Sequence, residues 1–147
     1  MKKQITATVA TLSFIVVLTT IGFAGLGATL NAKVPFDFMV NGKTMPAGEY
    51  TLTPGAAPYT LIIRNVEKGD AAITIVRKGN DGMNQHANLT FRRYGNQSFL
   101  AATNDGWGGS QELPVSKAEQ KAARGKDNLA MKDVTPEIIT IGATIGQ

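Results

Sequence analysis

Histidine and cysteine, the side chains on which most nucleophilic catalysis and zinc binding depend, are almost missing from this chain. The 147 residues contain one histidine, His86, and no cysteine. A zinc site with paired histidines and a Cys-His dyad are therefore not available within one chain, and a Ser-His-Asp triad would have to use His86. His86 lies in a polar, glycine-rich stretch, so we interpret it as a solvated loop residue. We therefore expect no metal site and no cofactor.

The acidic residues remain as candidates for acid–base chemistry or for calcium binding. The eleven Asp and Glu are scattered, with no run of the EF-hand type. Asn80-Asp81-Gly82 and Asn104-Asp105-Gly106 resemble fragments of calcium loops, but such sequences are also typical of ordinary turns, and we interpret them as turns. Asp37 and Glu49 lie on segments expected to be neighbours, where a glycosidase pair would have to converge. We expect both to face solvent and assign no catalytic residue.

The stretch TNDGWGGSQE offers a different chemistry, recognition by an aromatic side chain. Trp107 is the only tryptophan and stands between two glycines, so it is not expected inside a strand. Aromatic residues on polar loops often form carbohydrate- or peptide-binding surfaces. We select Trp107 and Asp105 as binding residues, with Arg93 and Tyr94 beside them at the end of a neighbouring predicted strand. The competing interpretation, which we favour, is that Trp107 folds back as a plug over one open end of the fold.

These residues belong to a body that follows an apolar N-terminal segment. Two lysines precede an uncharged run, residues 5–28, and this order is typical of a secretory signal. We predict a signal peptide over residues 1–32, cleaved after Ala28 or Ala32, and a single exported domain, residues 33–147, in the periplasm or outside the cell. The alternative is that the apolar run anchors the protein in the inner membrane, because about 20 apolar residues suffice to span it.

The charge of the body argues against a nucleic-acid partner. The formal net charge of the chain is +4, and without the two N-terminal lysines the remaining 13 Lys and Arg and 11 Asp and Glu leave +2. Nucleic-acid binding needs a basic footprint, but the body has only two adjacent basic pairs, Arg77-Lys78 and Arg92-Arg93, which we interpret as solvated strand ends. The partners we expect are a glycan or an envelope protein, with membrane contact only through an uncleaved N-terminal segment.

The body is patterned as short β-strands. Segments rich in β-branched and aromatic residues recur about every ten residues, which predicts an antiparallel β-sandwich of about seven or eight strands, with a small closed β-barrel as the alternative. Segments 59–65 and 72–77 are apolar on both faces and are predicted to be central strands. The predicted strands are 34–40, 49–53, 59–65, 72–77, 88–94, 97–103 and 138–144.

Turn and cap residues mark where these elements begin and end. Asn41-Gly42 suits a tight hairpin turn, so we interpret VPFDFMVNGKTMPAGEYTL as the hairpin with which the sandwich begins. Ser116 and Glu119 form a capping box and Gly125 supplies a stop, which together predict a short helix over 117–124.

Two blocks of the body carry a family resemblance. They are VPFDFMVNGKTMPAGEYTL and LTFRRYGNQSFLAATNDGWGGSQELPVSKAEQKAAR, with the motifs VPFDF, PAGxY, RYG and ELPxSxxE. The chain resembles a family of small exported proteins of unknown function from Gram-negative soil bacteria. The resemblance covers most of the body before Asp127, and it implies no activity and no catalytic residues.

The function we expect is that of an exported, non-enzymatic β domain that binds or assembles at the cell envelope. A small-ligand carrier with a barrel interior is the alternative, and a carboxylate-based hydrolase comes third. A carrier needs an unfilled interior, whereas a binding or assembly domain has a filled core with an aromatic patch near Trp107 or an unprotected edge strand. A hydrolase needs carboxylates, or a carboxylate and a lysine, converging in a cleft.

Overall fold

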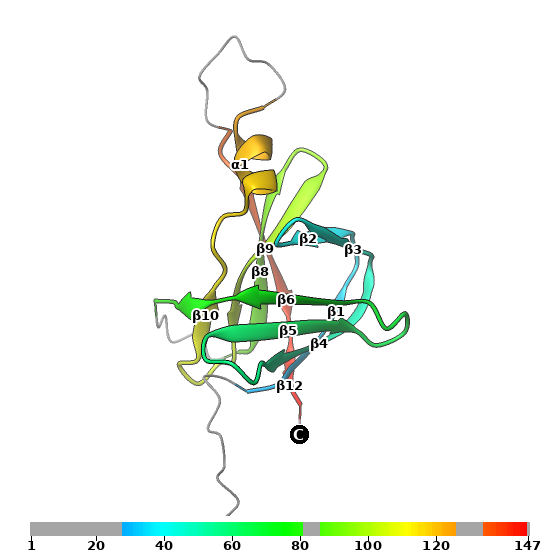
Figure 1. Ribbon diagram of the computed structural model, residues 1–147, viewed down its shortest axis with the longest axis vertical. Helices are drawn as coiled ribbons and strands as arrows, with labels where there is room; N and C mark the ends of the chain where they lie inside the picture. The colour runs from blue at the N-terminus through cyan, green and yellow to red at the C-terminus, as the bar shows by residue number, and fades with distance from the viewer. Residues whose placement is uncertain (1–27, 81–85, 126–133, 147) are drawn as a thin grey trace, which may run out of the picture.

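Within the described residues two β-sheets and one short helix make up the fold, which confirms the predicted all-β sandwich (Figure 1). The predicted number of seven or eight strands is too low, because breaks in the pairing divide the described chain into twelve short strands. The computed structural model describes residues 28–80, 86–125 and 134–146. The first sheet has five strands, and every pairing between them is antiparallel. In spatial order its strands are β12 (Thr144–Ile145), β1 (Leu30–Val34), β4 (Gly48–Pro54), β5 (Thr60–Asn65) and β6 (Ala71–Ile75).

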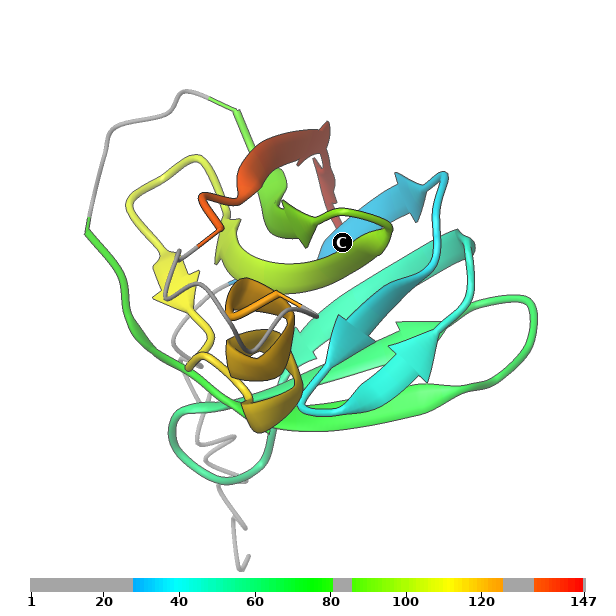
Figure 2. The same ribbon diagram turned by 90° about the horizontal axis from the view of Figure 1, so that it is seen from above.

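The second sheet is strongly curled, as the view from above shows (Figure 2). A hairpin of β2 (Phe38–Val40) and β3 (Lys43–Met45) joins it through a parallel bridge between Met39 and Phe99. Helix α1 (Lys117–Ala123) lies at the end where the β8–β9 hairpin turns (Figure 1). The main path of this sheet is β11 (Glu137–Gly142), β8 (Asn88–Tyr94), β9 (Gln97–Asn104), β10 (Ser110–Glu112) and β7 (Arg77–Lys78).

Both margins of the sandwich are formed by segments that pass from one sheet to the other. Only Val76 separates β6 from β7, and only Ala143 separates β11 from β12. Each of these residues still donates its N–H to a backbone oxygen, Val76 to Tyr59 at 2.7 Å and Ala143 to Ala87 at 2.9 Å. The two sheets are therefore connected on both sides by hydrogen-bonded chain.

The space between the sheets is filled with side chains. Phe38 packs edge to face against Tyr50 and Phe91, with ring centroids 5.0 and 5.3 Å apart, and all three residues are buried. Aliphatic side chains from both sheets complete one core cluster. Burial of a large apolar side chain contributes about 1.5–3 kcal/mol, so hydrophobic burial holds the two sheets together in a chain that has no cysteine.

The prediction of one strand over residues 34–40 is wrong. Val34 ends β1 in the first sheet, and Phe38 begins β2 in the second. Between them Pro35 has no N–H with which to continue a ladder, and Asp37 uses its Oδ1 to accept the N–H of Ala47 at 2.8 Å. The VPFDF motif thus carries the chain from one sheet to the other.

The hairpin inside this stretch is confirmed. β2 pairs with β3 around Asn41 and Gly42, whose φ angles are +48° and +82°. Positive φ at both central residues is what a type I′ turn requires, and its twist matches that of the flanking strands. The next strand, β4, pairs with β1 and β5 rather than with this hairpin.

Of the two predicted central strands, one is confirmed and one is wrong. β5 lies between β4 and β6, but β6 is the last strand of the first sheet. The side chains that β6 turns inward are Ala72 and Thr74, whereas Ile73 and Ile75 are 64% and 68% exposed. Two apolar faces suggested a buried strand, yet the bulkier face of β6 lies in solvent.

The predicted helix and the final strand are confirmed. α1 ends with the cap residue Arg124, and Gly125 follows at φ +71°, as expected for a helix stop. At the start of the helix the Ser116 Oγ accepts the N–H of Glu119 at 3.1 Å. The predicted segment 138–144 becomes β11 and β12, which pair with β8 and β1.

The first strand begins earlier than the predicted start of the mature domain. Leu30 and Ala32 are buried and belong to β1, which pairs with both β4 and β12. Most of the predicted signal peptide, residues 1–27, lies outside the described residues. None of the described segments forms an apolar helix of the length that a bilayer crossing needs.

Candidate recognition site

The loop between β9 and β10 carries Trp107, and its backbone is held by the two side chains before it. Asn104 Oδ1 accepts the N–H of Gly106 at 2.6 Å. Asp105 Oδ1 accepts the N–H groups of both Trp107 and Gly109 at 2.8 Å. A single carboxylate oxygen thus ties the tryptophan to the far end of the loop, and this ordering follows directly from the sequence NDGWGG.

The Trp107 side chain points into solvent. Its exposed fraction is 86%, the highest among the exposed large apolar side chains of the described chain, so the interpretation of Trp107 as a plug is wrong. The core is already filled by strand residues. On the other side of the loop, a Cβ on Gly106 would lie 3.1 Å from the Ala87 nitrogen and 3.2 Å from the His86 carbonyl carbon. The loop backbone at Gly106 thus lies against residues 86–87, whereas the indole of Trp107 lies in solvent.

Arg93 and Tyr94 do not lie beside Trp107, so that part of the predicted site is wrong. In the β8–β9 hairpin these two residues are next to the turn, whereas Asn88 at the far end pairs with Asn104. The strands between the two ends span about 20 Å at about 3.4 Å per residue. The turn of the hairpin is at the top of Figure 1 and the β9–β10 loop is at the bottom. Antiparallel pairing separates them.

The structure gives Arg93 and Tyr94 partners within the fold. The Arg93 guanidinium lies over the Phe36 ring, 4.8 Å from its centroid, and its Nε donates to Ser98 Oγ at 3.0 Å. The Tyr94 hydroxyl donates to Glu119 Oε1 at 3.4 Å. Arg93 therefore ties the β8–β9 hairpin to the segment before β2, and Tyr94 ties it to α1.

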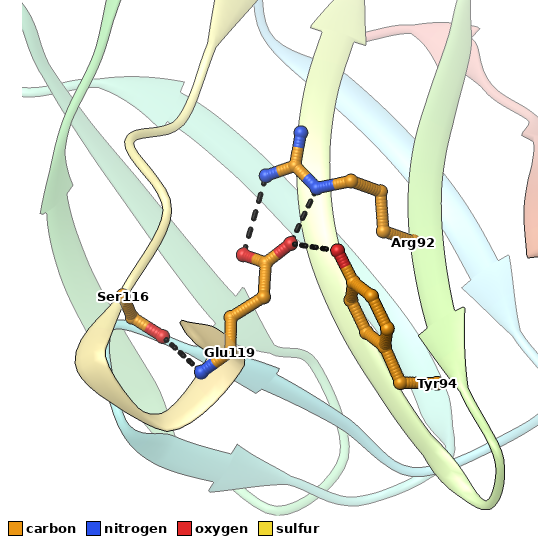
Figure 3. A network of polar contacts seen from close by, with 4 residues as sticks. All are labelled: Arg92, Tyr94, Ser116 and Glu119. Atoms are coloured by element: carbon orange, nitrogen blue, oxygen red, sulfur yellow. Dashed lines mark hydrogen bonds and ion pairs between the residues drawn. The ribbon is translucent and has the colours of Figure 1, made fainter. Parts of the chain in front are cut away.

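A buried charge that the sequence interpretation did not select as a site residue lies on α1 (Figure 3). Glu119 is 2% exposed. Arg92 on β8 donates from Nε to Oε1 and from Nη2 to Oε2, the latter at 3.2 Å. The carboxylate therefore binds β8 and does not complete the reciprocal half of the predicted capping box with Ser116. We call Glu119, Arg92 and Tyr94 the helix clamp.

The electrostatics of the helix clamp favour a fixed ion pair. Burial lowers the pKa of Arg92, but the hydrogen bond and negative charge of Glu119 outweigh this effect and raise it. Burial raises the pKa of Tyr94, and the charge of Glu119 raises it further. At neutral pH the guanidinium stays charged and the phenol stays protonated, so both continue to donate to the carboxylate.

A pocket of about 230 Å³ lies beside the helix clamp, between β6, β2, β9 and the segment that leads into α1. Its volume is below the roughly 300 Å³ at which most ligand pockets begin. Glu119 and Lys117 both line it, which is the pairing that a hydrolase would need. The two oxygens of Glu119 already accept three hydrogen bonds from Arg92 and Tyr94, so this carboxylate acts as a structural ion-pair partner.

The other described candidates for chemistry are exposed or belong to a turn. Asp37 and Glu49 are both exposed, as expected, and Asn104-Asp105-Gly106 forms a turn, as expected. Asp81 lies outside the described residues, and His86 is exposed. Within the described ranges, no group of three or more His, Cys, Asp or Glu side chains is placed to hold a metal ion.

Comparison of the chain with protein-family models, with curated proteins and with solved structures finds no significant match.

Proposed function

We propose that this protein is an exported, non-enzymatic β domain that binds a glycan of the cell envelope through the Trp107 loop. The observation that carries the proposal is the 86% exposure of Trp107 on a loop whose backbone is held by Asn104 and Asp105. A tryptophan can bury about 150–250 Å² on binding. Because the loop is already ordered, binding would lose little conformational entropy.

The surroundings of Trp107 favour a glycan over an apolar ligand. Its neighbours in the loop are glycines and Asp105, whose second carboxylate oxygen, Oδ2, takes no part in the hydrogen bonds that hold the loop. An aromatic face beside a carboxylate acceptor complements a sugar ring, which has an apolar C–H face and hydroxyl donors at its rim. A peptide of an envelope protein is the other ligand that such a loop accommodates.

The two alternative functions have less support. A carrier needs an empty interior, but the interior between the sheets is packed with aromatic and aliphatic side chains. The open groove of about 1010 Å³ between α1 and the β8–β9 turn lies outside the sandwich, so it is not the barrel interior that a carrier needs. For a hydrolase, the one buried carboxylate among the described residues, Glu119, is paired with Arg92.

Export rests on the N-terminal sequence, and the position of β1 favours one of the two predicted cleavage sites. Cleavage after Ala28 would leave β1 complete, whereas cleavage after Ala32 would remove Leu30 and Ala32 from the core. Mass spectrometry of the protein recovered from the exporting cell is expected to give Thr29 as the first residue. An intact N-terminus would instead support the membrane anchor. Membership in the resembling family of exported proteins remains a prediction.

Ligand binding can be tested with Trp107 as its own reporter, because it is the only tryptophan. The mature protein is screened against arrays of envelope glycans and of peptides. Hits are titrated by tryptophan fluorescence with the wild type, and by calorimetry with the wild type and every variant. Trp107→Ala is expected to weaken glycan binding about tenfold to a hundredfold, as removal of a central aromatic anchor does. The matched control is Tyr59→Ala, which removes another aromatic side chain that is 54% exposed.

Two outcomes would overturn the proposal. Equal binding by the wild type and Trp107→Ala would remove the loop from the recognition site. Binding of peptides alone would refute the glycan and leave an envelope protein as the partner of the same loop.

A further inference from the structure

β6 presents an apolar face and an open backbone edge at the same residues. Ile73 and Ile75 are 64% and 68% exposed on the outer face of the first sheet. On the same face Ile62 of β5 stands opposite Ile73. Exposed apolar edge strands are the usual sites of strand-to-strand association, and most proteins protect them.

The hydrogen-bond pattern shows which backbone groups of β6 point to the free edge. The N–H of Val76 donates to Tyr59, and the N–H of Asn65 donates to Asp70. In an antiparallel pair, bonded residues alternate, so the even-numbered residues of β6 bond to β5. The N–H and C=O groups of Ala71, Ile73 and Ile75 therefore point away from β5. Within the described chain no strand pairs with this edge.

Protection of the edge is limited to its ends. Lys43 donates from Nζ to the carbonyl oxygen of Ala71 at 2.7 Å, and Thr74 Oγ1 donates to the carbonyl oxygen of Ile75 at 3.3 Å. The N–H and C=O of Ile73, between them, have no bonding partner among the described residues. Lysine near an edge is a common means of blocking strand addition, but here it leaves the middle of the strand open.

We propose that two copies of this chain dimerise by antiparallel pairing of β6 across a twofold axis at Ile73. In this register Ile73 faces Ile73 of the second copy, and Ala71 faces Ile75. Each outward N–H of one strand therefore meets an outward C=O of the other. The carbonyl of Ala71 can accept a second hydrogen bond because it has two lone pairs. The isoleucines of both copies form one apolar strip on the joined sheet.

The charges at the two ends of β6 favour a second copy over an unrelated strand. The exposed Asp70 precedes the strand, and the exposed Arg77, whose Nε also lies 3.4 Å from Glu112 Oε2, follows it. In the proposed register Asp70 of each copy lies diagonally across from Arg77 of the other, so that these two opposite charges attract. Such an interface is self-complementary, as twofold symmetry requires. It involves the first sheet and does not depend on the Trp107 loop, which belongs to the second.

Cysteine cross-linking tests the register, because the chain has no cysteine of its own. At the axis the two copies of residue 73 would have Cα atoms about 5.5 Å apart, within the range of a disulfide. The two copies of residue 75 would be offset by four residues, or about 13 Å. Under mild oxidation Ile73→Cys is expected to give a disulfide-linked dimer, and Ile75→Cys is expected to form no disulfide between copies.

Sedimentation of the unmodified protein provides an independent measurement. Over concentrations from about 1 μM to about 1 mM, the wild type is expected to show a monomer–dimer equilibrium. Ile73→Lys should weaken it at least about tenfold, because two like charges would meet at the axis. The matched control, Ile138→Lys, alters an isoleucine that is 59% exposed on β11 and should leave the equilibrium unchanged.

Three results would overturn the proposal. They are a monomer at every concentration, equal cross-linking of Ile73→Cys and Ile75→Cys, and loss of the dimer in Ile138→Lys but not in Ile73→Lys.

Discussion

Removing the carboxylate of Glu119 is expected to destabilise the fold far more than removing an exposed carboxylate. Glu119→Gln leaves the Arg92 guanidinium without its ion-pair partner. Loss of one partner from a fully buried pair costs about 3–5 kcal/mol. The Arg92 side chain, however, is 24% exposed while that of Glu119 is 2% exposed, so water can partly solvate the remaining charge. We therefore expect the free energy of unfolding to fall by about 2–3 kcal/mol.

A double-mutant cycle isolates the interaction from the other effects of each substitution. The cycle consists of Glu119→Gln, Arg92→Met and the double variant, with unfolding by denaturant followed by circular dichroism. We expect a coupling free energy of about 1.5–2.5 kcal/mol, since hydrogen bonds to charged groups contribute about 1.5–3 kcal/mol. The two residues lie 27 positions apart in the sequence, so the coupling measures the docking of α1 on β8.

The pair formed by Arg77 and Glu112 provides the control cycle. Their Nε and Oε2 atoms are 3.4 Å apart, and their side chains are 70% and 39% exposed. Exposed pairs contribute about 0–1 kcal/mol, so Arg77→Met with Glu112→Gln should show little coupling. A coupling below about 0.5 kcal/mol for Arg92 and Glu119, or equal values in both cycles, would refute the interpretation of the helix clamp as a buried ion pair.

Two further predictions concern the Trp107 loop and the core at alkaline pH. Asp105→Ala should lower the fluorescence anisotropy of Trp107, because two backbone N–H groups lose their acceptor. Asp105→Asn retains an oxygen acceptor and should preserve the anisotropy. Unchanged anisotropy in Asp105→Ala would show that the carboxylate does not hold the loop. Burial raises the pKa of Tyr50 above 10.0, so the folded state favours the protonated phenol. The stability that the protonated phenol contributes is complete below pH 10.0, and it is lost as the pH rises through the higher folded-state pKa. Denaturant unfolding between about pH 9 and 11.5 should therefore show a smaller alkaline loss of stability in Tyr50→Phe than in the wild type. Tyr59→Phe is the exposed control. The same dependence of the unfolding free energy on pH in all three proteins would contradict the raised pKa of Tyr50.

The features that the sequence predicts correctly are those governed by a few consecutive residues. Asn41-Gly42 forms the expected turn, and Gly125 follows the helix as expected, because positive φ is a local property of these residues. Alternation of side chains likewise locates most strands, since burial on one face of a sheet requires a period of two. The exposed Trp107 loop is held by hydrogen bonds that the Asp105 carboxylate accepts from nearby backbone N–H groups. Its role as a candidate site therefore follows from the sequence.

The partners of each element were decided by tertiary structure, because they depend on contacts between residues far apart in the sequence. The pattern of residues 72–77 does not reveal that β6 is an edge strand, since apolar residues on both faces occur in edge strands as well as in central strands. Glu119 has the sequence context of a helix cap, but Arg92 draws its carboxylate to β8. Arg93 and Trp107 are 14 positions apart in the sequence, and antiparallel pairing of β8 and β9 places them at opposite ends of the sandwich. Local preference thus determined the elements, and packing of the common core determined which of them meet.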